Sequence, residues 1–137
     1  MEETAIVLML KEQETGFLTK ELGCYTVVGN PALLYQIYAE ETEHGIVVHM
    51  GLTCEKETQD WEYEAIFDYY DTEALAEWTD QVVEEEGHWN PVWFAMFPFL
   101  QEEEEMKRRM EDILQAHALE LQSVYEAIVD KKDDYCE

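Results

Sequence analysis

Lysine and arginine are scarce in this sequence. Eight of the 137 residues are Lys or Arg, against 33 Asp and Glu, and the formal net charge is −25 at pH 7. Proteins that bind nucleic acids or anionic membranes use clustered Lys and Arg to displace counterions from phosphate groups. The composition therefore excludes direct binding to nucleic acid and to an anionic membrane surface, and it predicts a cationic partner.

Cysteines and long apolar runs are also few. The three cysteines, Cys24, Cys54 and Cys136, form no CxxC pair, and an odd number without that spacing is typical of reduced thiols in a cytoplasm. The two longest runs without a charged residue cover residues 22–39 and 87–101, and both are shorter than the ~20 residues of a membrane-spanning helix. The first residues are acidic and lack the basic segment of a signal peptide. These absences predict a cytoplasmic protein without a membrane-spanning segment.

Motifs for catalysis and cofactor binding are missing as well. The chain has no glycine-rich phosphate loop and no GxSxG sequence, and its four histidines show neither HxxxH nor HExxH spacing. Asp68, Asp71 and Glu73 lack the glycine and the ligand spacing of an EF-hand, so at most weak, nonspecific binding of Ca²⁺ or Mg²⁺ is expected. We therefore expect a non-enzymatic protein with no metal centre and no cofactor. An enzyme that uses paired carboxylates such as Glu64 and Asp68 is a minor alternative.

Apolar residues, by contrast, are plentiful. They make up 47% of the chain, and aromatic residues make up 12%, whereas disordered acidic segments contain few of either. A chain of this length and composition can bury one hydrophobic core. We therefore expect a folded protein with a single core.

β-Branched and alternating apolar runs predict about five strands. A hairpin is expected near the N-terminus, with Gly16 in its turn and Gly23 at a bulge in its second strand. The run bracketed by Pro91 and Pro98 is mostly aromatic and aliphatic, which favours a buried strand over an exposed docking strip. The expected strands cover residues 4–10, 17–28, 45–53, 59–70 and 88–100.

Apolar residues at helical spacing predict three helices. The first covers residues 31–41, with Pro31 at the first helical position. The second begins after an N-cap at Thr72 and ends at Gly87. The third is one long helix over residues 101–134.

The predicted fold class is α+β. Residues 1–100 are expected to form a small, mainly antiparallel sheet with helices on one face, and residues 101–137 a long C-terminal helix. At ~1.5 Å per residue that helix would be about 50 Å long, more than the width of such a domain. It therefore packs across its own sheet or pairs with a second chain. The expected dimer-interface residues form its apolar stripe: Met110, Ile113, His117, Leu121, Val124 and Ile128.

The acids are unevenly distributed along the chain. No Lys or Arg occurs between Lys56 and Lys107, an interval that contains sixteen Asp and Glu. On a strand over residues 59–70, aromatic residues would face the core and acids the solvent, and the helix that follows would add further acids beside them. The expected partner-binding residues are acids of this interval and one exposed aromatic anchor: Glu62, Glu64, Asp68, Tyr70, Asp71, Glu73, Glu77, Asp80, Glu84 and Glu85.

Two functions from different classes fit this distribution. The first is a small interaction protein that binds a basic protein through the acidic surface. One form of it is a nucleic-acid mimic that inhibits a nucleic-acid-binding protein, as anti-defence proteins do. The second is a homodimeric regulatory or scaffold domain that acts through its C-terminal helix, with the acids as a solvated face. Salt-sensitive binding would distinguish the first function from the second.

Overall fold

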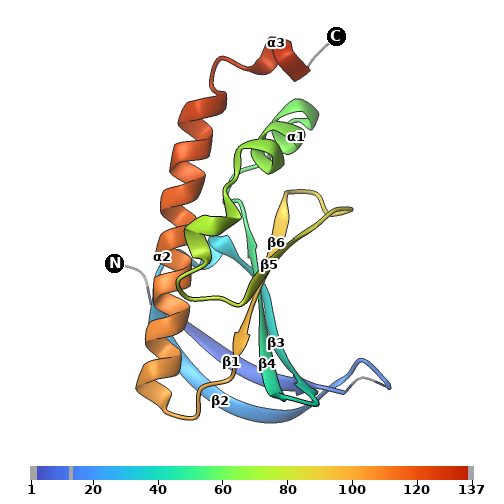
Figure 1. Cartoon of the computed structure of the whole chain (residues 1–137), viewed down its shortest axis with the longest axis vertical. Coiled ribbons are helices and arrows are strands. Elements are labelled where there is room, and N and C mark those ends of the chain that lie inside the picture. Colours follow the sequence, from blue (N-terminus) through green and yellow to red (C-terminus); the bar gives the residue numbers. More distant parts are fainter. Residues whose placement is uncertain (1–2, 13, 136–137) are drawn as a thin grey trace.

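A six-stranded sheet and one long helix form the fold in the computed structural model, which describes residues 3–12 and 14–135 (Figure 1). The strands are β1 (Glu3–Lys11), β2 (Leu18–Val28), β3 (Leu34–Thr42), β4 (Gly45–Thr53), β5 (Gln81–Glu85) and β6 (Val92–Pro98). The helices are α1 (Asp60–Tyr69), α2 (Glu103–Ile128) and α3 (Lys132–Tyr135), with short 3₁₀ helices η1 (Pro31–Leu33) and η2 (Thr72–Leu75).

The sheet has the strand order β2-β1-β3-β4-β6-β5. Neighbouring strands are antiparallel except β1 and β3, which run parallel with Leu10 opposite Ala39. The α+β class and the long C-terminal helix are therefore confirmed. The sheet has six strands rather than five, and it is mixed.

The N-terminal hairpin forms as the sequence predicts. Gly16 has a φ of +75° in the turn between β1 and β2, a conformation that glycine adopts without steric cost. The register shifts between Leu8 and Met9, whose partners are Gly23 and Glu21. This shift is the expected bulge in the second strand.

Residues 34–42 form a strand instead of the expected helix. Pro31 begins only the single turn η1, where the Asn30 side chain accepts a hydrogen bond from the Ala32 amide. The chain then enters the sheet, and Ala39 is fully buried opposite Val48. Pairing with β4 overrides the helical spacing of the apolar residues, which only tertiary contacts can reveal.

Residues 60–69 show the opposite difference, because the expected strand is the helix α1. Ala65 and Ile66 are both fully buried, whereas adjacent residues of a strand point to opposite faces. The expected second helix is reduced to η2, and it begins after Asp71 rather than Thr72. Val82 and Val83 then pair with β6 as part of the edge strand β5.

The helix α2 covers one face of the sheet and completes the core (Figure 1). It ends at Ile128, so the expected single helix is divided into α2 and α3. The residues expected at a dimer interface are each at most 2% exposed within the single chain: Met110, Ile113, His117, Leu121, Val124 and Ile128. This corrects the expectation that they lie between two chains, because the sheet and α1 already cover this stripe.

Candidate partner-binding surface

The helix α1 begins with a capping interaction that uses one of the predicted binding residues. The Gln59 amide donates to Glu62 Oε1 at 3.0 Å, and Lys56 Nζ lies 3.2 Å from Glu62 Oε2. The Glu62 side chain is only 16% exposed. Glu62 therefore stabilises the start of the helix, and its carboxylate is not part of a free acidic face.

The other acids of α1 are exposed. Glu64 and Asp68 are separated by one helical turn. Asp68 Oδ2 accepts a hydrogen bond of 2.8 Å from the Tyr135 hydroxyl of α3. That hydrogen bond is the main reason why the pKa of Tyr135 rises to about 12.

The segment that follows α1 continues the acidic surface. Asp71 Oδ1 accepts a hydrogen bond from the Glu73 amide and caps η2, while the Asp71 amide donates to Glu120 on α2. Glu73, Glu77 and Asp80 are exposed. The structure therefore places these acids on the solvent side of a segment held against α2.

The strand β5 brings acids from a distant part of the sequence close to α1. Glu84 and Glu85 are exposed, and Glu85 Oε2 lies 2.9 Å from His88 Nε2. The pKa of Glu84 is raised by partial burial and then by the negative charges of Glu86 and Asp68. Asp68 on α1 and Glu84 on β5 are therefore close enough for their charges to interact. Both elements contribute to one acidic surface.

Tyr70 is the predicted residue that the structure corrects most clearly. It is 6% exposed, and its ring stacks on Trp93 with the centroids 4.3 Å apart. Its hydroxyl donates a hydrogen bond of 2.8 Å to His117 Nδ1. Tyr70, the residue directly after α1, is therefore a core residue and not an exposed anchor.

His117 is the centre of this buried network. Its Nε2 donates to the Thr53 carbonyl oxygen at 2.8 Å, so Nδ1 is the acceptor for Tyr70 and the imidazole is neutral. Burial lowers the pKa of His117 to about 4, and the hydrogen bond to Thr53 opposes part of that shift. The network joins α2, β4 and the residue that follows α1, so His117 lies in the core and not between two chains.

The strand β6 is largely buried, as its composition predicts. Trp93 and Phe97 are fully buried, but Trp89, in the turn before β6, is 80% exposed. Trp89 lines a cleft of about 710 Å³ between α1 and the β5–β6 turn. We call this the acidic cleft; it is lined by Thr58, Gln59, Asp60, Tyr63, Glu64, Glu86, Gly87, His88 and Trp89.

The acidic cleft combines carboxylates with aromatic rings. Three of its lining residues are acids and none is Lys or Arg. Sequence reasoning identified Glu64 but missed the other members, because Glu86 and Trp89 reach α1 only through the pairing of β5 with β6. A lysine or arginine side chain of a partner would find both charge and ring contacts here.

Few cations compensate the acids of residues 57–105, all of which are described. In that interval only Glu62 and Glu85 make ion pairs, with Lys56 and His88. Arg109 donates to the Trp78 carbonyl oxygen and lies over the Phe97 ring. Within the described helix α2, no ion pair within 4 Å joins the acids of residues 103–105 to the cations of residues 107–109.

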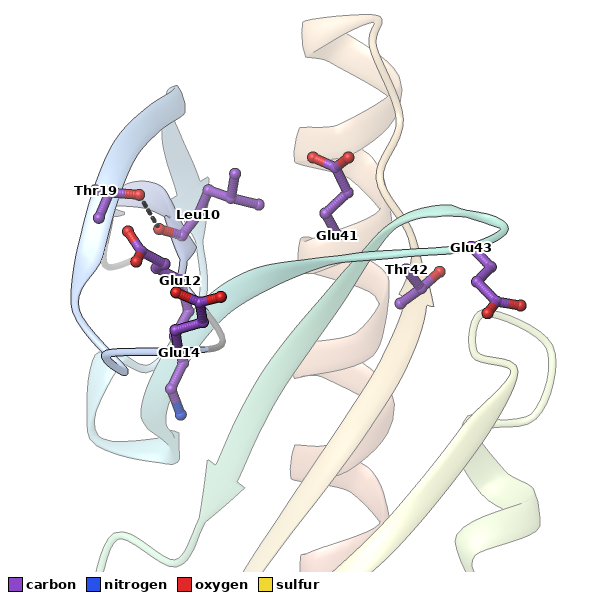
Figure 2. Close-up of a pocket in the computed structure, with 8 residues that line it drawn as sticks. Leu10, Glu12, Glu14, Thr19, Glu41, Thr42 and Glu43 are labelled. Carbon is purple, nitrogen blue, oxygen red and sulfur yellow. Dashed lines mark hydrogen bonds between the residues drawn. The ribbon is translucent and has the colours of Figure 1, made fainter.

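A second acidic cleft lies between two hairpins, outside the predicted surface. Figure 2 shows Glu12 and Glu14 at the tip of the β1–β2 hairpin, with Glu41 and Glu43 across from them at the end of the β3–β4 hairpin. Its volume is about 700 Å³, and Lys11 also lines it. The negative charge of the molecule therefore extends beyond residues 57–86.

The thiols and the metal-binding side chains give no sign of a reaction centre in the described residues. Cys24 and Cys54 are free, and burial raises the pKa of Cys54 to about 11, so this thiol is protonated at neutral pH; Cys136 lies outside the described residues. Within the same residues, no group of three or more His, Cys, Asp or Glu could hold a metal ion. None of the described helices is long and apolar enough to cross a membrane.

Comparison with known proteins places the chain in a family. Residues 1–136 match a family of unknown function, DUF6762. The chain belongs to this family. No curated protein and no solved structure matches the chain.

Proposed function

We propose that this member of DUF6762 is a non-enzymatic, cytoplasmic interaction protein that binds a basic protein. The contact surface is the set of exposed carboxylates from residues 57–86, which we call the acidic surface: Glu57, Asp60, Glu64, Asp68, Asp71, Glu73, Glu77, Asp80, Glu84, Glu85 and Glu86. The observation that supports the proposal most is the acidic cleft, where carboxylates and aromatic rings meet without Lys or Arg.

The electrostatics of the acidic surface favour this function over a merely solvated face. A net charge of −25 destabilises the compact state through self-repulsion and exceeds the magnitude of about 2 to 8 that keeps a small domain soluble. A basic partner would relieve the repulsion, and the field of the acids would accelerate its association.

A nucleic-acid-binding protein is the partner class that fits best. Such proteins carry a groove lined with Lys and Arg for a polyphosphate chain. A row of carboxylates on α1, η2 and β5 offers comparable negative charge on a rigid protein scaffold. In this form of the proposal the protein is a nucleic-acid mimic of the anti-defence type. It blocks the groove of the nucleic-acid-binding protein.

The homodimer acting through its C-terminal helix is not proposed further. Its support was the apolar stripe of α2, which packs inside the chain's own core. The face of α2 that remains exposed includes only one large apolar side chain among the described residues of that helix, Leu119. Nothing in this face resembles a continuous seam for a second helix.

Affinity capture from host lysate tests the proposal. The tagged protein should retain a basic nucleic-acid-binding protein that elutes as salt rises from about 50 mM to about 500 mM. DNA or RNA should compete for the same partner, and mass spectrometry would identify it. Retention of partners only in a salt-insensitive manner, or retention of no basic protein, would contradict the proposal.

A further inference from the structure

The face of the sheet opposite α2 carries a row of aromatic side chains. The helix α2 covers one face of the strands β3 to β6, and in the described part of the chain no helix covers the other (Figure 1). We call the uncovered side the outer face. The register places Tyr38, His49 and Met96 opposite one another on it, and in the next row Phe94 lies opposite Val83.

The rings of the outer face contact one another. Tyr38 stacks on His49 at 4.9 Å between centroids, and Phe94 lies between Tyr38 and Tyr35 at 6.0 and 6.4 Å. A Cβ added to Gly51 would lie 3.0 Å from the Phe94 ring, so this ring packs closely over the backbone of β4. The aromatic row is therefore a set of rings that pack against one another and against the sheet, with the Phe94 ring at 59° to that of Tyr38 and at 85° to that of Tyr35.

The outer face is open to solvent, and one of its rings already holds a cation. Tyr35 is 45% exposed and Val83 is 40% exposed. Lys11 Nζ lies 4.6 Å from the centroid of the Tyr38 ring, which is a cation–π distance. Neighbouring rings can accept the cations of a partner through the same interaction.

Carboxylates border the aromatic row and connect it to the acidic cleft. Glu40 and Glu85 are close enough to Tyr38 to add to the rise that burial causes in its pKa. Glu85 pairs with His88, whose ring lies 4.9 Å from that of Tyr35. Because His88 also lines the acidic cleft, the cleft and the outer face form one continuous surface.

Charge complementarity selects one occupant for this surface. A second copy of the chain would bring two identical carboxylate borders together, each on a molecule with a net charge of −25. The phosphates of a nucleic acid would meet the same repulsion. A basic polypeptide instead places its cations beside the carboxylates and lays its aliphatic stems along the rings.

We infer that the outer face binds a lysine- and arginine-bearing segment of the basic partner, which extends from the acidic cleft past His88 onto Tyr35 and Phe94, beside the Tyr38 ring that Lys11 already covers. This inference rests on the proposed function, because the segment belongs to the basic protein proposed above. It adds that the aromatic row, and not the carboxylates alone, forms part of the contact surface.

An NMR titration of the ¹⁵N-labelled protein tests the inference directly. The probe is a synthetic peptide of about ten residues that alternates arginine and glycine, and the controls are a glutamate–glycine peptide and oligothymidylate. We expect the arginine peptide to shift the amides of Tyr35, Tyr38, Val83 and Phe94 together with those of Glu64 and Glu86. The two controls should shift none of them.

A matched pair of variants tests whether the peptide contacts a ring of the outer face or binds through charge alone. Tyr35→Ser should weaken peptide binding about five-fold, the loss expected for one cation–π contact, whereas Phe17→Ser removes a ring that is 71% exposed in the β1–β2 turn and should have no effect. The amide spectrum of each variant verifies its fold. Val83→Lys, on the exposed edge strand, should also weaken binding through repulsion.

The possible results distinguish this inference from the proposed function. Shifts confined to the acidic cleft would overturn the inference and leave the proposed function intact. An absence of shifts with the arginine peptide would overturn both. Shifts caused by oligothymidylate, or by raising the protein concentration without peptide, would show that another occupant uses the outer face.

Discussion

His117 shows how the surroundings of one residue decide its role. Four histidines without metal spacing are uninformative in the sequence, but the structure gives this one two hydrogen-bond partners and no solvent. The neutral imidazole accepts from Tyr70 and donates to Thr53, so protonation would remove an acceptor and place a charge in the core. His117 therefore joins Tyr70 to β4 in the neutral form, and its protonation at low pH would destabilise the fold.

We predict that His117 makes the protein lose stability in acid. An unfolded histidine has a pKa of about 6.5, and the folded value is about 4, so the unfolded state binds more protons between these values. The free energy of unfolding should therefore fall as the pH falls from about 6.5 to 4, by roughly 3 kcal/mol in total.

Urea unfolding of the wild type and His117→Gln across that pH range checks this prediction. The comparison is needed because protonation of the many carboxylates also changes stability, and relieves repulsion. The advantage of the wild type over the variant should shrink as the pH falls. A difference in free energy that stays constant from pH 7 to pH 4 would contradict the account of His117.

Residue-level prediction from the sequence succeeded where composition alone decides exposure. Glu64, Glu73 and Glu77 are exposed as expected, because isolated acids without partners remain in water. Tyr70 and Glu62 could not be placed in this way. Their positions depend on a stacking contact with Trp93 and on a helix start that the sequence pattern did not indicate.

At the level of elements, the reliable predictions concern segments with one dominant pattern. The β1–β2 hairpin, β4, β6 and α2 were predicted because turn glycines, β-branched runs or a long helical stripe leave little ambiguity. The segment that forms β3 was expected to be a helix, and the segment that forms α1 was expected to be a strand. Each is short, and neighbours in the sheet or the core determine its conformation.

The start of α1 gives a prediction that separates two acids of the same helix. Glu62→Ala should lower the free energy of unfolding by about 1 kcal/mol, because it removes the carboxylate that accepts from the Gln59 amide. Glu64→Ala should leave stability nearly unchanged, because Glu64 is exposed and makes no such contact. Urea unfolding of both variants at neutral pH measures the difference.

In partner binding, the order of these two variants should be reversed. Glu64→Ala should weaken binding because Glu64 lines the acidic cleft, whereas Glu62→Ala should affect it less. Equal stability losses in both variants would show that α1 does not begin with this capping interaction.

At the scale of the whole molecule, the sequence predicted the amount of charge but not how the charges are arranged on the surface. The interval without Lys or Arg is visible directly, and so is the preference for a basic partner. The acidic cleft is not, since it forms where the β5–β6 turn meets α1. The aromatic outer face was also missed, because Tyr35 and Tyr38 were expected on a helix.

The association rate of the captured partner tests the central claim most directly. Glu64→Lys/Glu86→Lys reverses two charges in the acidic cleft, and Glu21→Lys/Glu126→Lys makes the same change in net charge at exposed positions on β2 and α2. Stopped-flow measurements at about 50 mM salt should show association slowed at least ten-fold by the cleft variant and much less by the control. Equal effects of the two variants, or none, would contradict the claim that the acidic surface around α1 and β5 receives the partner.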